Sequence, residues 1–345
     1  MLKNSNIETH QLIADILSFD NDNSILKKKL ETSKIDWENI VQTASRHLVL
    51  TTLYCRLNQK NLLHLLPQDL SDYLKDITSI NRNRNKKLIE EAQSLTAMLQ
   101  KHNIEFVFIK GMALLIGGYF KDIGERMIGD IDILVLEKDA ESAFDILKKE
   151  GYSKLVEFNY DKSNFRHLPR QINEKKLAAV EIHTHVLNPS HRYLLPIDTI
   201  FESRLSSSDY RTPNSYHLNL INILTSQLND KNYYYNTLNF KNSYDSLVLR
   251  ILNHIENTDF NKSKFVLHFI NLNSVWFREL NLINVSGHNT LRMRSYVLKI
   301  KYKEFEKSLK LIKFASFTVI NRLNLFFMNK SYRNYLFNSI IFRKS

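Results

Sequence analysis

Glycine, proline and cysteine are scarce in this chain, which has seven Gly, five Pro and a single Cys among its 345 residues. So few Gly and Pro residues argue against a loop-rich or all-β protein and favour long helices. The lone Cys55 excludes an intramolecular disulfide bond, which is consistent with a reducing compartment. Because hydrophobic residues still make up 43% of the chain, a sizeable core is available.

Two kinds of hydrophobic segment are missing as well. Residues 1–20 lack the basic-then-apolar order of a signal peptide. No apolar run approaches the roughly 20 residues that a membrane-spanning helix needs, and the longest candidate, residues 314–320, is too short. We therefore expect a soluble, cytoplasmic protein with no transmembrane segment.

Acidic residues are nearly absent from the C-terminal segment, residues 291–345, which we call the basic tail. It holds 13 Lys and Arg residues but only two acids, Glu304 and Glu306, so it supplies +11 of the net charge of +12. Such a surface attracts phosphates, nucleic acid or anionic lipid. The alternative is a solvated helical face that aids solubility, and the sequence favours neither.

The hydrophobic pattern divides the rest of the chain into a small α/β unit between two helical regions. Residues 83–102 follow the helical period, and Asp36 is placed to cap a helix that begins at Trp37. Short apolar, β-branched runs predict strands, and residues 173–175 suit a hairpin turn. Further predicted helices cover residues 69–77, 112–117, 139–150, 216–228 and 243–255; the predicted strands are 105–109, 131–136, 152–158, 165–172 and 176–183.

The predicted fold class is therefore α+β, with a small mixed β-sheet core flanked by helices. We divide the chain into an N-terminal helical region (1–103), the core (104–192) and a C-terminal helical region with the basic tail (193–345).

Asp130 and Asp132 open the apolar strand at residues 131–136. Residues two apart on a strand point to the same face, so these carboxylates project together while the isoleucines between and after them face the core. Two adjacent carboxylates repel each other, and a divalent cation with oxygen ligands relieves that repulsion. The pair predicts a metal site, although surface strands also carry such pairs by chance.

Two further features strengthen this interpretation. Lys110 and Gly111 lie between a strand and a helical turn, where glycine lets the backbone approach a phosphate and the helix start offers free amide donors. Glu181 is a lone acid in another apolar strand, where an unpaired charge is rare. If that strand lies beside the one that carries Asp130, three carboxylates surround one or two metal ions. Such ions suit phosphoryl or nucleotidyl transfer.

These motifs, in this order, resemble a known family. The sequence Phe-Ile-Lys-Gly-Met-Ala-Leu-Leu at 108–115 is followed by Tyr119, Arg126, Gly-Asp-Ile-Asp-Ile-Leu-Val at 129–135, Gly-Tyr at 151–152, His167 and Val-Glu-Ile-His at 180–183. The chain is similar to the uncharacterised nucleotidyltransferase family of the DNA polymerase β-like superfamily, which often occurs in bacteria near polysaccharide-synthesis genes. The resemblance covers roughly residues 36–260 and is strongest between 106 and 185.

The resemblance implies an activity: transfer of a nucleoside monophosphate from an NTP to an acceptor hydroxyl, with release of pyrophosphate. It also implies that Asp130, Asp132 and Glu181 hold Mg²⁺ or Mn²⁺, and that Glu181 draws the proton from the acceptor. Gly111 corresponds to the triphosphate turn, and Arg126 to a basic position that touches phosphate. The alternative for Arg126 is a salt bridge with Glu125 or Asp122.

The chain departs from the wider superfamily in three ways. Met112 stands where a second Gly or a Ser is usual, the loop from Gly111 to Asp130 is longer, and the third acid is Glu rather than Asp. These differences bear on nucleotide choice and on catalytic competence.

Histidines near Glu181 need a separate interpretation. His183 shares the face of Glu181 and is placed to contact phosphate or the acceptor. A zinc site built on His183 and His185 lacks evident further ligands, and His167 and His185 are expected to be structural. For Asp245, a helix cap or surface acid is favoured over a role in a substrate pocket.

Two other functions remain open at this point. Asp-x-Asp pairs also bind nucleotide-sugars in metal-dependent glycosyltransferases, although that fold expects a larger α/β half before the pair. The chain could instead be a catalytically degenerate nucleotide-binding module. The acceptor, whether sugar, protein or RNA, is not visible in the sequence, and the basic tail favours an anionic acceptor or surface.

Overall fold

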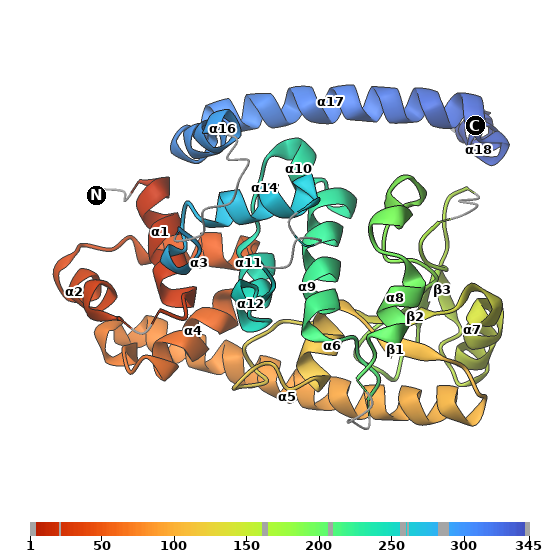
Figure 1. Cartoon of the computed structure of the whole chain (residues 1–345), viewed down its shortest axis with the longest axis horizontal. Helices are drawn as coiled ribbons and strands as arrows, with labels where there is room; N and C mark the ends of the chain where they lie inside the picture. Colours follow the sequence, from red (N-terminus) through yellow and green to blue (C-terminus); the bar gives the residue numbers. More distant parts are fainter. Residues whose placement is uncertain are drawn as a thin grey trace.

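The computed structural model describes residues 5–20, 22–160, 165–205, 210–255, 260, 262–281 and 290–341. Its small mixed sheet lies between two sets of helices, so the predicted α+β class is confirmed. The chain runs from the N-terminal helices, along one long helix, into the sheet, and back through the C-terminal helices (Figure 1).

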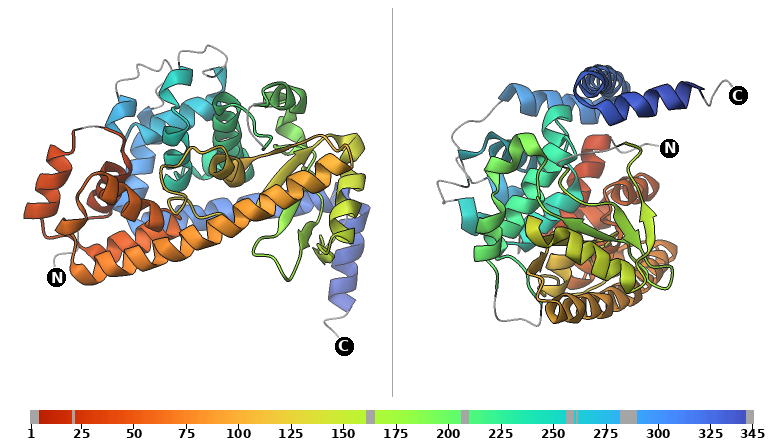
Figure 2. Two further views of the ribbon diagram at one scale, coloured as in Figure 1. Left: turned by 90° about the horizontal axis from the view of Figure 1, so that it is seen from below. Right: turned by 90° about the vertical axis from the view of Figure 1, so that its right-hand side faces the viewer.

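The described part of the N-terminal region contains the helices α1 (Asn6–Leu17), α2 (Ser24–Thr32), α3 (Trp37–Arg46), α4 (Leu50–Gln59) and α5 (Gln68–Lys101). Asp36 caps α3 as predicted, because its side chain accepts a hydrogen bond from the Asn39 amide. Seen from below, α5 crosses the whole face of the molecule (Figure 2, left). It links the N-terminal helices to the sheet.

The prediction of two separate helices within residues 69–102 is wrong, because α5 is continuous over 34 residues. Polar residues in the middle of α5 interrupt the hydrophobic pattern, so the helical period is not visible there. Asn81 and Asn85 are buried, and their side-chain amides donate hydrogen bonds to carbonyl groups of residues 123–126. Since neither Gly nor Pro occurs within α5, nothing interrupts the helix.

The sheet contains all five predicted strands in shortened form: β1 (Phe106–Phe108), β2 (Ile131–Val135), β3 (Lys154–Val156), β4 (Arg170–Ile172) and β5 (Val180–His183). Their spatial order is β1-β2-β5-β4-β3, with β2 and β5 parallel and the other pairs antiparallel. The predicted turn is present, since the Lys176 amide donates to the Asn173 carbonyl at 2.9 Å. Helices α6 (Lys110–Ile116) and α7 (Ala140–Lys149) follow β1 and β2.

The C-terminal region is helical, as expected. Its helices are α8 (Ile197–Glu202), α9 (Ser215–Leu224), α10 (Asn232–Tyr235), α11 (Phe240–Val248), α12 (Leu252–Ile255), α14 (Lys264–Asn273), α15 (Arg278–Asn281), α16 (Thr290–Lys301), α17 (Lys303–Met328) and α18 (Lys330–Ile341). A π-helical turn, Thr225–Asn229, extends α9, and 3₁₀ turns occupy Leu63–Leu65, Glu137–Asp139 and Pro189–Leu194. The N-terminal helices pack on this region, where Gln11 donates to the Trp276 carbonyl and Ser18 to Glu279.

The expectation that no segment is apolar and long enough to cross a membrane is wrong. Within α17, Glu304–Met328 reaches a mean hydropathy of 1.3 and is long enough by length and composition alone. Lys313 and Arg322 break the apolar run, so counting uninterrupted residues misses the helix. It lies on the side of the molecule opposite α5 (Figures 1 and 2, right), and none of its most apolar stretch is buried.

Three histidines in this fold have strongly lowered pKa values. Burial lowers the pKa of His47 to about 3, of His167 to about 4 and of His268 to about 3, from an ordinary value of 6.5. Below pH 6.5 the unfolded chain binds protons at these residues that the folded chain does not. We therefore predict that the free energy of unfolding falls as the pH drops from 6.5 to about 4, by up to about 1.4 kcal/mol per pH unit for each histidine.

Urea unfolding at several pH values measures this slope, and His268→Gln should make it shallower. An unfolding free energy that stays constant between pH 6.5 and 4 would contradict the buried neutral state of these rings.

Candidate active site

The three predicted acids converge at the junction of β2 and β5. These strands are parallel neighbours in which Asp132 lies directly opposite Glu181, and Asp130 immediately precedes β2. Asp132 and Glu181 are both buried, each with 7% of its surface exposed. The proximity that the proposed metal site requires is therefore present for Asp132 and Glu181.

His183 completes a compact group of metal-ligand atoms. One ligand atom each from Asp132, Glu181 and His183 lies within 4.8 Å of the others. The His183 Nε2 atom is 2.8 Å from Asp132 Oδ1 and 3.4 Å from Glu181 Oε2. The sequence predicts that His183 contacts phosphate or the acceptor; in the structure its ring lies against the two carboxylates. Asp130 lies outside this group and reaches Glu181 through Arg170.

The two other histidines have different surroundings. His185 Nδ1 lies 3.5 Å from Glu137 Oε1, so His183 and His185 do not point at one metal position. His167 pairs with His183 across an isolated β-bridge, and their ring centroids are 5.1 Å apart. Its Nδ1 atom lies 2.8 Å from the Leu168 carbonyl oxygen. Both arrangements fit the structural roles expected for His167 and His185.

Two protein cations contact the carboxylates. Lys110 Nζ lies 2.6 Å from Asp132 Oδ1. Arg170 Nη2 bridges two acids, at 3.0 Å from Asp130 Oδ2 and 2.7 Å from Glu181 Oε1. Arg170 was missed in the sequence, although a signal existed. A hairpin that turns at 173–175 and pairs Gln171 with Val180 places Arg170 beside Glu181.

The cations determine which acids are ionised. Burial acts to raise the pKa of Asp132, but the charge of Lys110 and the hydrogen bond with His183 outweigh it, so that pKa lies below its ordinary value. Burial is likewise outweighed at Glu181 by hydrogen bonds with His183 and Arg170, and its pKa lies well below normal. At Asp130 burial prevails over the attraction of Arg170 and raises the pKa. Two of the three carboxylates are therefore firmly ionised.

Close packing explains the glycine after Lys110. A Cβ atom on Gly111 would lie 3.0 Å from Ile128 Cδ1 and 3.6 Å from Arg126 Nη2. Lys110 itself has a φ of 56°, which directs the chain sharply from β1 into α6. Because α6 has only seven residues, side chains rather than its N-terminus are the groups placed to bind phosphate.

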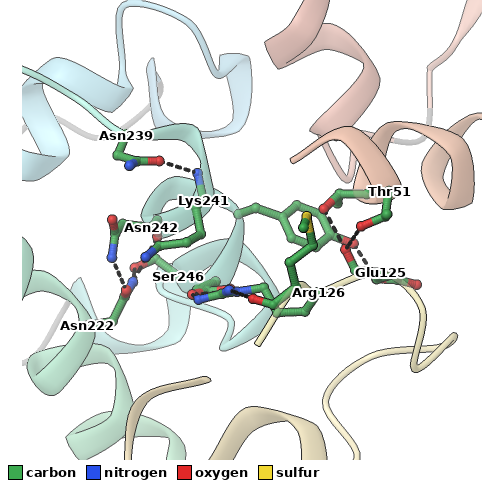
Figure 3. A network of polar contacts seen from close by, with 12 residues as sticks. Thr51, Glu125, Arg126, Asn222, Asn239, Lys241, Asn242 and Ser246 are labelled. Atoms are coloured by element: carbon green, nitrogen blue, oxygen red, sulfur yellow. Dashed lines mark hydrogen bonds and ion pairs between the residues drawn. The ribbon is translucent and has the colours of Figure 1, made fainter. Parts of the chain in front are cut away.

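Figure 3 shows Arg126 within a network of polar contacts, and an acid from the C-terminal region holds its side chain. Its guanidinium donates to Asp245 on α11 at 2.9 Å and 3.0 Å, and both side chains are buried. The expected alternative partners of Arg126 are wrong, because Asp122 pairs with Arg82 and Glu125 accepts from Tyr244. Asp245 is likewise neither a helix cap nor a surface acid. Its partner lies 119 residues away, so local sequence gave no indication of this pair.

These groups line a cavity of about 380 Å³ between the sheet and the C-terminal helices. Six of the seven predicted site residues line it, and His183 lies behind them. The lining includes basic residues that sequence analysis missed, namely Arg166, Arg170 and Lys241. A larger, more apolar cavity of about 750 Å³, on the side of Phe19 and Tyr244, is lined by none of the predicted site residues.

Breaking the Arg126–Asp245 pair tests how strongly it joins α11 to the loop before β2. We predict that Asp245→Asn lowers the free energy of unfolding by about 3–5 kcal/mol, because a buried guanidinium loses its counter-charge. Chemical denaturation measures the loss. The double variant Arg126→Met, Asp245→Leu should cost less than the single change.

Glu174→Gln removes an exposed acid that pairs with Lys154 and serves as the control. A result in which Asp245→Asn is as stable as this control would contradict the structural role of the pair.

Comparison with known proteins agrees with this geometry. No curated protein is significantly similar to the chain. A family model described as uncharacterised nucleotidyltransferase matches residues 33–228, which span the N-terminal helices from α3 onward, the sheet and α9. Since the match covers more than half of the chain and includes every predicted site residue, the protein belongs to this uncharacterised nucleotidyltransferase family.

Proposed function

We propose that the protein is a metal-dependent nucleotidyltransferase that moves a nucleoside monophosphate from an NTP to an acceptor hydroxyl and releases pyrophosphate. One observation carries the proposal: ligand atoms of Asp132, Glu181 and His183 lie within 4.8 Å of one another, at the wall of a cavity that also contains Asp130 and several cations. Family membership supports nucleotidyl transfer in general.

Mg²⁺ or Mn²⁺ fits the donors that are present. Asp130, Asp132 and Glu181 offer carboxylate oxygens, the donors that both ions prefer, and the low pKa values of Asp132 and Glu181 keep them ionised. When bound there, the ion would neutralise phosphate charge and lower the pKa of the attacking hydroxyl. Glu181 is a weak base while Arg170 holds it, so we assign it primarily as a ligand.

The cationic wall provides the site for the triphosphate. Lys110, Arg126 and Lys241 line the cavity together with Gly111. Burial lowers the pKa of Lys241, and a bound anion would stabilise its charged form. We propose that Lys110 and Lys241 contact the phosphates directly. Asp245 balances the charge of Arg126 and fixes its orientation, so the N–H groups of Arg126 rather than its net charge are available to a phosphate. His183 orients Asp132 from behind.

The sheet argues against the glycosyltransferase alternative. Within the part of the chain that the structure describes, β1 is the one strand that precedes β2, so the large α/β half expected before the acidic pair is missing. A catalytically degenerate module would bind NTP without turning it over, so a turnover assay separates it from an active enzyme. We propose that the acceptor hydroxyl is carried by a sugar, a protein or an RNA, and labelled products in the assay below would identify it.

Removing a ligand tests the proposal directly. We predict that Asp132→Asn reduces metal-dependent release of pyrophosphate from NTPs roughly a hundredfold or more, because the metal loses a charged oxygen donor. Assays use each labelled NTP with Mg²⁺ or Mn²⁺ and cell extract as the source of acceptor. Circular dichroism checks that the fold is retained.

Glu174→Gln, in an exposed ion pair, should keep the activity of the unaltered protein. Equal turnover by Asp132→Asn and the unaltered protein would eliminate the metal-site interpretation. Absence of turnover in the unaltered protein, with NTP binding retained, would favour the degenerate module.

Arg170 competes with the metal for Asp130 and Glu181. We predict that Arg170→Gln lowers the Mg²⁺ or Mn²⁺ concentration needed for half-maximal turnover by about fivefold, corresponding to about 1 kcal/mol for a partly exposed ion pair. Metal titration at saturating NTP measures the shift. If the metal requirement rises instead, Arg170 supports the bound metal or substrate rather than competing with it.

A further inference from the structure

Exposed apolar side chains occur on several faces of helix α17, and five of them form one line, which we call the apolar stripe. It consists of Phe305, Ile312, Val319, Leu323 and Phe326, spaced seven, seven, four and three residues apart. That spacing places all five on one face of a helix. Between 36% and 64% of the surface of each is exposed. Water contact with so much apolar surface is unfavourable, which indicates an interaction site.

A different face of α17 rests on the body of the protein. The Tyr234 hydroxyl lies 3.3 Å from the Lys313 carbonyl oxygen and from Ser316 Oγ, and Lys313 Nζ donates to the Tyr234 carbonyl at 2.8 Å. Lys231 Nζ lies 3.8 Å from the centroid of the Phe317 ring. Because a helix turns about 100° per residue, the middle of the apolar stripe lies at least about a quarter turn from Lys313 and Phe317, and Ser316 borders the stripe on the side of the body. The stripe therefore faces away from the body.

The charge around the stripe identifies its partner. The basic tail has 13 cations and two acids, and Lys307, Lys310 and Arg322 are exposed on α17 itself. A second copy docked on the stripe would bring two segments of +11 together, and they would repel each other. An anionic bilayer offers both hydrocarbon for the stripe and negative charge for the cations.

We propose that the apolar stripe and the cations of the basic tail bind the surface of an anionic lipid bilayer, with α17 lying in the plane of the membrane. A crossing orientation would place Lys313 and Arg322 in hydrocarbon, at high cost. It would also break the contacts of Lys313 and Phe317 with the region around α10, which hold the helix along the body. The proposal does not depend on the proposed enzymatic activity.

Vesicle co-sedimentation of the full chain tests the proposal. The protein should sediment with vesicles of phosphatidylcholine and phosphatidylglycerol, much less with phosphatidylcholine alone, and less as salt rises. Replacing three stripe residues (Ile312→Ser, Val319→Ser, Leu323→Ser) should weaken binding roughly tenfold or more. Neutralising three cations (Lys307→Gln, Lys310→Gln, Arg322→Gln) should remove the preference for anionic lipid.

The matched control is Tyr73→Ser with Ile80→Ser. These residues lie seven apart on α5, are 48% and 68% exposed, and belong to the opposite side of the molecule (Figure 1). The control should bind vesicles like the unaltered protein. Circular dichroism of each variant separates loss of binding from loss of fold.

Three results would overturn the proposal. One is that the stripe variant binds each vesicle type as strongly as the unaltered protein does. Another is retention on vesicles after alkaline and high-salt washing, which would indicate a crossing helix. The third is absence of vesicle binding together with self-association that the stripe substitutions abolish, which would assign the stripe to a second copy of the chain.

Discussion

The parallel pairing of β2 with β5 is the constraint on which the site depends. It places Asp132 opposite Glu181 and lets His183 reach both carboxylates. Buried carboxylates in such proximity are tolerable only beside positive charge, and Lys110 and Arg170 supply it from the strand-to-helix turn after β1 and from β4. The charge balance of the site therefore depends on this strand pairing, because a shift of either strand would separate the acids from the cations.

The C-terminal helices contribute further residues to the site that the sheet carries. Asp245 on α11 holds Arg126, and Lys241 on the same helix adds a cation to the cavity wall. The next segment links this cavity to the tail, because Asp230 lines the cavity while its neighbour Lys231 stacks on Phe317 of α17. A membrane bound along α17 would therefore lie on the side of the cavity that Asp230 lines.

Sequence patterns predicted the elements that carry strong periodicity. Short apolar runs predicted β1, β2 and β5, and Asp132 in β2 and Glu181 in β5 indicated the candidate site. Prediction failed where buried polar residues form hydrogen bonds with partners far along the chain. The middle of α5 contains buried asparagines whose partners lie on the loop at residues 123–126. Similarly, averaging over α17 shows an apolar helix where a count of uninterrupted residues found none.

The sequence by itself determined which residues are chemically equipped for the site, because an acid in an apolar strand is costly without a cation to neutralise it. Asp130, Asp132, Glu181 and Lys110 could all be named in this way. Tertiary structure decided their partners. Arg170 at Glu181, Asp245 at Arg126 and His183 against Asp132 depend on strand register and on a helix far along the chain. Ion pairs form between groups that are close in space, and separation along the chain does not encode that distance.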